Sequence, residues 1–133
     1  MRFEPALDIK ARVEHIVKKL RFSHIKPEQI FCIRSHNSKA RAYARIWSLS
    51  KVWQKCLGIK PHYIIEVLSQ HFDKLPPEAQ EKIIIHELLH IPKSFSGAVV
   101  AHNTMHFDGT GGHVKRRIDK RTVERLHKLL NAP

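Results

Sequence analysis

The chain has 133 residues, which suits one ordinary domain and is too short for two. Apolar residues make up 42% and charged residues 27%, a balance typical of a globular protein, so a long disordered chain is excluded. Twenty-four Lys and Arg against twelve Asp and Glu give a formal net charge of +12. This excess predicts attraction to polyanions but says little about the fold.

The first predicted element is an amphipathic helix, because apolar residues recur at helical spacing from Ile9 to Leu20 before Pro27 breaks the pattern. Strand-forming residues follow in three runs, with a turn and a short helix between them. The strands are expected at Gln29–Arg34, Ala42–Trp47 and Tyr63–Leu68, the turn at Ser35–Lys39, and the helix at Ser50–Leu57, closed by Gly58.

The second half of the chain predicts two further helices. Pro76, Pro77 and Glu78 mark the start of one, which continues to Leu89 until Pro92 stops it. Ser94–Gly112 is expected to be a long loop, and the last helix to occupy part of His113–Leu130, with Ile118, Val123, Leu126 and Leu130 facing inward. The order predicts an α+β domain over residues 1–133, with a small mixed or antiparallel sheet packed against three helices.

An HExxH motif, His86-Glu87-Leu88-Leu89-His90, lies within the predicted helix that begins at Pro77. Residues four apart share a face of an α-helix, about 6 Å apart along its axis, so both imidazoles can reach one metal ion. Glu87 is placed to contact a metal-bound water without being a ligand. The mostly apolar setting makes three polar groups costly unless they bind something, and one zinc ion suits the nitrogen ligands.

A third ligand is expected downstream, where the candidates are His102, His106 and His113, with Asp108 a weaker fourth. Lys93 and Ser96 occupy the positions where a metzincin would have glycine and histidine. No Glu occurs between Glu87 and Glu124, so a thermolysin-like glutamate ligand is excluded.

The chain resembles a family of archaeal and phage metallopeptidases, similar to the SprT/Spartan-type zincins. The resemblance covers most of the chain from Gln29 onward. It is carried by Arg34-Ser35, Lys39–Trp47, Lys60–Val67, Ile85–Gly97 and Arg121–Leu126.

The resemblance implies a zincin-like peptidase domain that uses zinc to cleave proteins, in some members DNA-bound proteins. The family pattern places a histidine shortly after Phe95-Ser96-Gly97, and His102 matches it. Gly112-His113 looks like the arrangement that precedes the third ligand in SprT-type enzymes, so His113 ranks second and His106 third.

The predicted function is therefore hydrolysis of peptide bonds by a zinc-bound water, with Glu87 as general base and His86, His90 and His102 as ligands. The strand Tyr63–Leu68 could pair with an extended substrate, or it could be a plain core strand. Two alternatives are a zinc nuclease, resembling YbeY but with Glu87 where those enzymes have glycine, and a non-catalytic nucleic-acid-binding module with structural zinc.

Two basic clusters predict weak, salt-sensitive affinity for nucleic acid. Tyr43, Trp47 and Trp53 lie within the first, and we expect these rings to be in the core. The clusters are Arg34, Lys39, Arg41, Arg45, Lys51 and Lys55, and then Lys115, Arg116, Arg117, Lys120, Arg121 and Arg125.

No stretch approaches the ~20 apolar residues that cross a bilayer, and the N-terminus lacks the apolar core of a secretory signal. Cys32 and Cys56 form no CxxC pair, which argues against a disulfide framework or a zinc ribbon. We expect a cytoplasmic location, no membrane partner, and both cysteines buried as small apolar residues without chemistry. The sequence does not indicate an oligomeric state.

Overall fold

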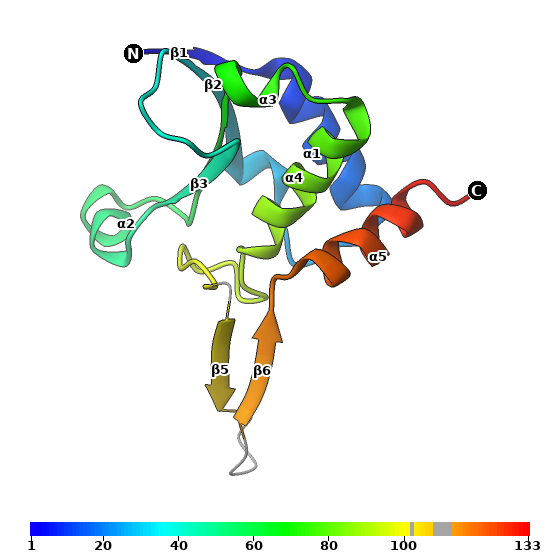
Figure 1. Ribbon diagram of the computed structural model, residues 1–133. Coiled ribbons are helices and arrows are strands. Elements are labelled where there is room, and N and C mark those ends of the chain that lie inside the picture. Colours follow the sequence, from blue (N-terminus) through cyan, green and yellow to red (C-terminus); the bar gives the residue numbers. More distant parts are fainter. Residues whose placement is uncertain (102, 108–112) are drawn as a thin grey trace.

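The computed structural model describes all of the chain except residues 102 and 108–112, and it describes only the backbone of the remaining residues in 103–117. A four-stranded sheet and the helices around it form the main body, and a two-stranded hairpin extends away from it (Figure 1). In chain order the elements are β1 (Arg2–Pro5), α1 (Leu7–Lys19), the 3-10 turn η1 (Pro27–Gln29), β2 (Ile30–His36), β3 (Ala44–Ser48), α2 (Lys51–Leu57), β4 (Tyr63–Leu68), α3 (Ser69–Phe72), α4 (Pro77–Leu89), β5 (Asn103–Phe107), β6 (His113–Arg117) and α5 (Lys120–Leu130). This arrangement confirms the α+β prediction.

The sheet is mixed, with strand order β1-β2-β4-β3. Strand β2 runs parallel to β4, with Ile30 opposite Tyr63 and Cys32 opposite Ile65, while β1 and β3 are antiparallel to their neighbours. Because β4 lies between β2 and β3, both of its edges are occupied. The expectation that Tyr63–Leu68 could pair with a substrate strand is therefore wrong, and β4 is a core strand.

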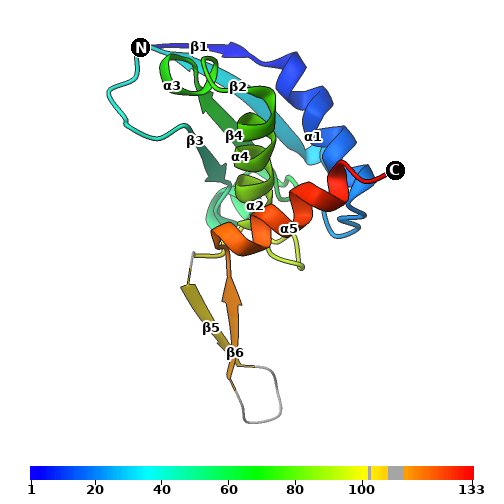
Figure 2. The same ribbon diagram turned by 45° about the vertical axis from the view of Figure 1, so that its right-hand side comes forward.

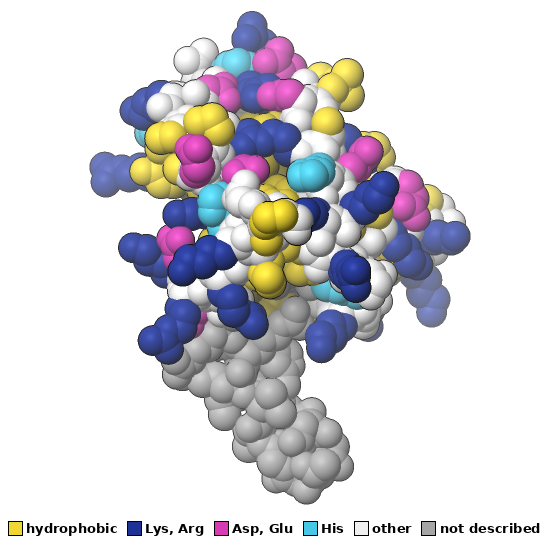
Figure 3. Space-filling view, turned by 90° about the vertical axis from the view of Figure 1, so that its right-hand side faces the viewer, with side chains coloured by type: hydrophobic (Ala, Val, Ile, Leu, Met, Phe, Trp, Pro, Cys, Tyr) yellow, Lys and Arg dark blue, Asp and Glu magenta, His cyan; other side chains and the backbone are white. Residues whose placement is uncertain are grey.

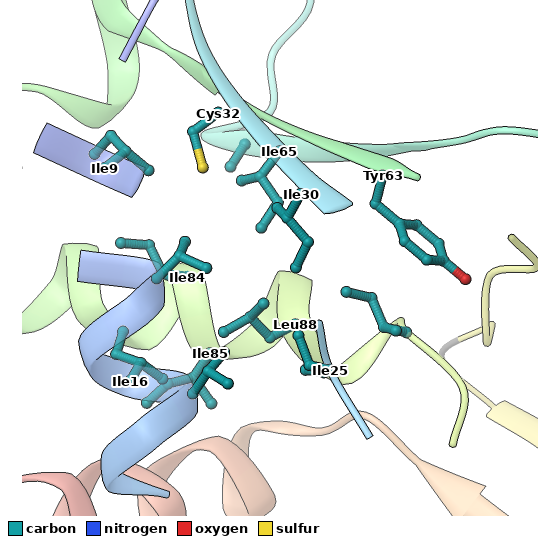
Figure 4. Packing of buried hydrophobic residues seen from close by; sticks show 14 of the residues in the cluster. Ile9, Ile16, Ile25, Ile30, Cys32, Tyr63, Ile65, Ile84, Ile85 and Leu88 are labelled. Carbon is teal, nitrogen blue, oxygen red and sulfur yellow. The ribbon is translucent and has the colours of Figure 1, made fainter. Parts of the chain in front are cut away.

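Helices α1 and α4 cover one face of the sheet, which we call the inner face (Figures 2 and 4). Alternate residues of β2 and β4 point into this interface, as the period of two in a strand requires. Residues three or four apart on α1 and α4 face the sheet and form the opposing layer. The residues that meet there include Ile30, Cys32, Tyr63 and Ile65 from the sheet, Ile9, Val13 and Ile16 from α1, and Ile84, Ile85 and Leu88 from α4.

Local signals in the sequence account for the helix boundaries. Helix α4 begins with Pro77 in its first turn, where the missing backbone N–H costs no hydrogen bond. Asp119 caps α5 by accepting a hydrogen bond from the Thr122 amide at 2.9 Å. Gly58 ends α2 in the left-handed conformation, at φ 65°, as a helix-terminating glycine commonly does. These helix predictions are confirmed.

Several expectations at the element level need correction. Strand β1 precedes the first predicted helix, and β2 continues through Ser35 and His36, where the sequence favours a turn. The expected loop Ser94–Gly112 contains β5, which pairs with β6 in a hairpin, so α5 begins only at Lys120. Ile118 is buried but precedes α5.

The two cysteines have different environments, and neither is in a disulfide. Cys32 is buried, and burial raises the pKa of its thiol to about 11, so the thiolate is disfavoured at neutral pH. Cys56 is exposed, contrary to the expectation that both would be buried.

No helix in the described part of the chain has both the length and the apolar character needed to span a membrane.

Candidate active site

The last turn of α4 carries the HExxH residues to the edge of the core. Ile84, Ile85 and Leu88 anchor this turn, each at most 1% exposed, against the sheet and α1. His86 and Glu87 line a cavity of about 700 Å³ that Ala44 of β3 and Val123 of α5 also border. A buried helix turn thus presents polar groups to a cavity large enough for part of a peptide.

The two motif histidines face each other. Nε2 of His86 lies 3.4 Å from Nε2 of His90, and the ring planes are 73° apart. Two nitrogen ligands of a tetrahedral zinc ion, each about 2.0–2.1 Å from the metal, are themselves about 3.3–3.4 Å apart. The pair therefore has the spacing that a single shared zinc ion requires.

The other ring nitrogen of His90 is fixed by the backbone. Nδ1 of His90 lies 2.5 Å from the Val100 carbonyl oxygen, and the Val100 amide donates back to the His90 carbonyl oxygen at 2.7 Å. A carbonyl oxygen only accepts, so Nδ1 carries the proton in this hydrogen bond. In the neutral ring the lone pair is then on Nε2, the atom that faces His86, which is the usual arrangement behind a metal-binding histidine.

Glu87 lies between the two histidines in sequence and is only 7% exposed. Burial raises the pKa of its carboxyl to about 7. A buried carboxylate is costly without a compensating charge, and a cation held by the neighbouring imidazoles would supply one. The carboxyl group is thus placed beside the cavity without occupying a ligand position on the His86–His90 pair.

The segment after α4 is held by side chains from the sheet and α2. The Tyr63 hydroxyl accepts a hydrogen bond from the Gly97 amide at 2.9 Å and donates to the Ala98 carbonyl oxygen at 2.8 Å. Nε2 of Gln54 donates to the Ser96 carbonyl oxygen at 3.0 Å. These bonds fix the chain just before Val100, and Val100 in turn orients His90.

Gly97 is the point in this segment where a side chain cannot be accommodated. Its φ is +93°, which L-residues rarely adopt, and a Cβ here would lie 2.5 Å from the Leu49 carbonyl oxygen and 2.2 Å from Nε2 of Gln54. We expect Gly97→Ala to destabilise the fold by about 1–3 kcal/mol and to weaken metal binding, because the segment that orients His90 must move. Thermal unfolding and zinc titration measure the two effects.

Gly58→Ala is the matched control, since Gly58 also has positive φ but, apart from its own neighbours along the chain, no atom lies within 4 Å of the point that a Cβ would occupy there. It carries only the cost of the left-handed conformation, about 1 kcal/mol. If both variants bind zinc as the wild type does, the Gly97 segment has no part in orienting His90.

The candidates for a third ligand lie outside the residues whose side chains are described. His102 itself is outside the described residues, and His106 and His113 are placed only as backbone, on β5 and at the start of β6. Asp108 is also outside the described residues. Among the side chains that are described, no three His, Cys, Asp or Glu residues gather around one point.

Strand β3 forms one border of the cavity and one edge of the sheet. It pairs with β4 on one side, and no other strand in the described part of the chain pairs with its opposite edge. Ala44 at the start of β3 and Tyr43 just before it line the cavity together with His86 and Glu87. An edge strand beside the motif can accept an extended peptide through backbone hydrogen bonds.

Comparison with known proteins bears on this arrangement. The chain matches the family described as "Putative phage metallopeptidase" over residues 1–131. The chain belongs to this family. The family description implies a metallopeptidase, with a metal ion as cofactor and a protein or peptide as substrate. In this chain the HExxH turn of α4 carries side chains of the kinds that bind metal ions. Neither curated proteins nor solved structures yield a match.

The sequence does not single out the groups that orient the motif. It predicts Tyr63 only as a strand residue and Gln54 as part of a short helix, yet both bond to the segment after α4. The Val100 carbonyl oxygen has no side-chain signature at all. Gly97 is the detectable signal, because a lone glycine just beyond a helix and a proline often has positive φ.

Proposed function

We propose that this family member is a zinc-dependent peptidase in which Glu87 is the general base and His86, His90 and His102 hold the metal. The observation that carries the proposal is the 3.4 Å separation between the Nε2 atoms of His86 and His90. The buried Glu87 carboxyl on the same helix turn supplies the second component. Family membership supports the reaction class.

When bound, zinc would supply a water of lowered pKa and a positive charge for the oxygen of the scissile carbonyl. Glu87 receives the proton of the attacking water and delivers it to the leaving amine. Val100 keeps the Nδ1 proton of His90 in place, so that Nε2 remains a donor to the metal.

The free edge of β3 is proposed to hold the substrate in extended form. This replaces β4, whose edges are both paired. The cavity beside β3 is mainly apolar, with Ile83, Ile118 and Val123 among its walls, so we expect a substrate side chain that enters it to be apolar. Lys82 and Glu124 border it as an ion pair at 3.0 Å.

The proposal is tested with the purified protein. We expect it to bind one zinc ion per chain, to cleave casein, to lose this activity to a chelator, and to regain it when zinc is restored. RNA is the parallel substrate: cleavage of RNA and not casein would show the nuclease alternative instead. Zinc binding without cleavage of either substrate would support a structural metal and contradict the proposal.

A further inference from the structure

The face of the sheet opposite α1 and α4, which we call the outer face, carries exposed aromatic rings. Phe31 of β2, Ile64 of β4 and Trp47 of β3 are direct cross-strand neighbours and form one row across three strands. Phe31 is 57% exposed and Trp47 is 47% exposed. The expectation that Trp47 belongs to the core is therefore wrong, and the same holds for Tyr43 and Trp53, which are also exposed.

The row of rings borders a hollow of about 370 Å³. The imidazole of His62 stacks on Phe31 with ring centroids 5.8 Å apart and planes 21° apart. The hollow is lined by Phe31, Trp47, Ser48, Leu49, Ile59, His62 and Ile64. Flat rings with aliphatic neighbours form a surface on which an unstacked base can lie.

The segment that supplies the lining of the hollow carries charge of one sign. From Gln29 to Ile65 the chain contains seven Lys and Arg and no Asp or Glu. Arg34 among them is paired with Asp8 and Asp73, but Lys51 and Lys55 of α2 and Lys60 beside His62 are exposed cations. On the side that carries α1 and α5, by contrast, acidic side chains lie among the basic ones (Figure 3).

Among the described residues of β2, β3 and β4, Glu66 is the acid of the outer face, and its charge is compensated. Glu66 is fully buried and accepts hydrogen bonds from Nε of Arg45 at 2.8 Å and from Nε1 of Trp47 at 2.7 Å. Burial raises the pKa of this carboxyl, but the neighbouring Arg45, Ser35 and Trp47 side chains together outweigh burial and hold the pKa below its usual value. A polyanion at the hollow therefore meets cations without an opposing exposed carboxylate from β2, β3 or β4.

We propose that the outer-face hollow binds single-stranded DNA, with a pyrimidine base on Phe31 and Trp47 and phosphates on the lysines of α2. Rings that are open to solvent need an unpaired base, which excludes a duplex. Among the described lining residues only Ser48 carries a hydroxyl, so the 2′-hydroxyl of RNA has little to bond, while Leu49, Ile59 and Ile64 suit the thymine methyl. This surface is separate from the HExxH turn, and the proposal does not depend on peptidase activity.

The test uses tryptophan fluorescence of the Trp53→Phe variant of the whole chain, in which Trp47 is the only tryptophan. We expect titration with an oligothymidylate of about 12 nucleotides to quench Trp47, and the affinity to fall as salt rises. An oligouridylate and a DNA duplex of the same length should bind at least about fivefold more weakly. Equal binding of either one would overturn the assignment to single-stranded DNA.

Matched variants locate the surface. In that background, Lys51→Glu on α2 should weaken oligothymidylate binding about fivefold, and Phe31→Ala about tenfold. Lys18→Glu on α1 makes the same change in net charge on the side of the molecule where acidic and basic side chains are mixed, and should leave affinity within about twofold. If Lys18→Glu weakens binding as much as Lys51→Glu, or if Phe31→Ala binds normally, the interaction is diffuse and the hollow is not its site. Circular dichroism verifies the fold of each variant, and Lys51→Glu does not touch the core.

Discussion

Glu87→Gln is expected to lower the rate of casein cleavage by at least about 100-fold while the zinc content of the protein stays the same. Glutamine keeps the size and polarity of the side chain, but its amide cannot accept a proton from water. Glu87 is next to two proposed ligands and is not one itself, so the metal should remain. Cleavage rates and metal analysis on the same preparation measure both quantities.

Glu78→Gln is the matched control for this prediction. Glu78 lies at the exposed start of the same helix, so its replacement removes the same charge from α4 without changing the cavity. We expect its cleavage rate to be within about twofold of the wild type. Cleavage at the wild-type rate by Glu87→Gln would show that another group takes the proton.

The helix that carries the motif is predictable because its signals are local. Pro76 and Pro77 mark its start and Pro92 follows its end, and these residues act on the backbone within a few positions of themselves. The spacing of His86 and His90 follows from helical geometry once the helix exists. Local rules therefore predict the two imidazoles that the structure brings to 3.4 Å.

The arrangement of the sheet is not predictable in the same way. The alternating pattern of Tyr63–Leu68 identifies a strand, but which strands flank it depends on pairing with residues 15 to 33 positions away. Likewise, the alternation around Trp47 places its ring on one face of β3 without saying which face the helices cover. The core position of β4 and the exposure of Trp47 both follow from this non-local choice.

The support of the motif is another non-local feature. His90 is oriented by a backbone carbonyl ten residues later, and that residue is held through Tyr63 and Gln54, which come from β4 and α2. None of these partners has a spacing that relates it to HExxH. Sequence reasoning therefore identifies the groups that would react, but it does not identify the groups that hold them in position.

His102→Ala is expected to weaken zinc binding by about 100-fold or more, whereas His113→Ala and His106→Ala should bind zinc normally. The argument rests on the described backbone on either side. Val100 is bonded to His90 through both its amide and its carbonyl group. Two residues of chain span at most about 7 Å, so the sequence distance from Val100 favours His102 over the later histidines as a partner of His86 and His90.

His113 starts β6 opposite Phe107, while Arg117 at the other end of β6 pairs with Asn103. At about 3.3 Å per residue, the His113 backbone is about 13 Å further along the hairpin than Arg117, where the chain returns to α5. The hairpin extends away from the main body, which carries His113 away from His86 and His90 (Figure 1). Competition with a chromophoric chelator ranks the three variants. Loss of zinc in His113→Ala with retention in His102→Ala would require the hairpin to fold back onto α4 when metal binds, because only then can its far end reach the cavity.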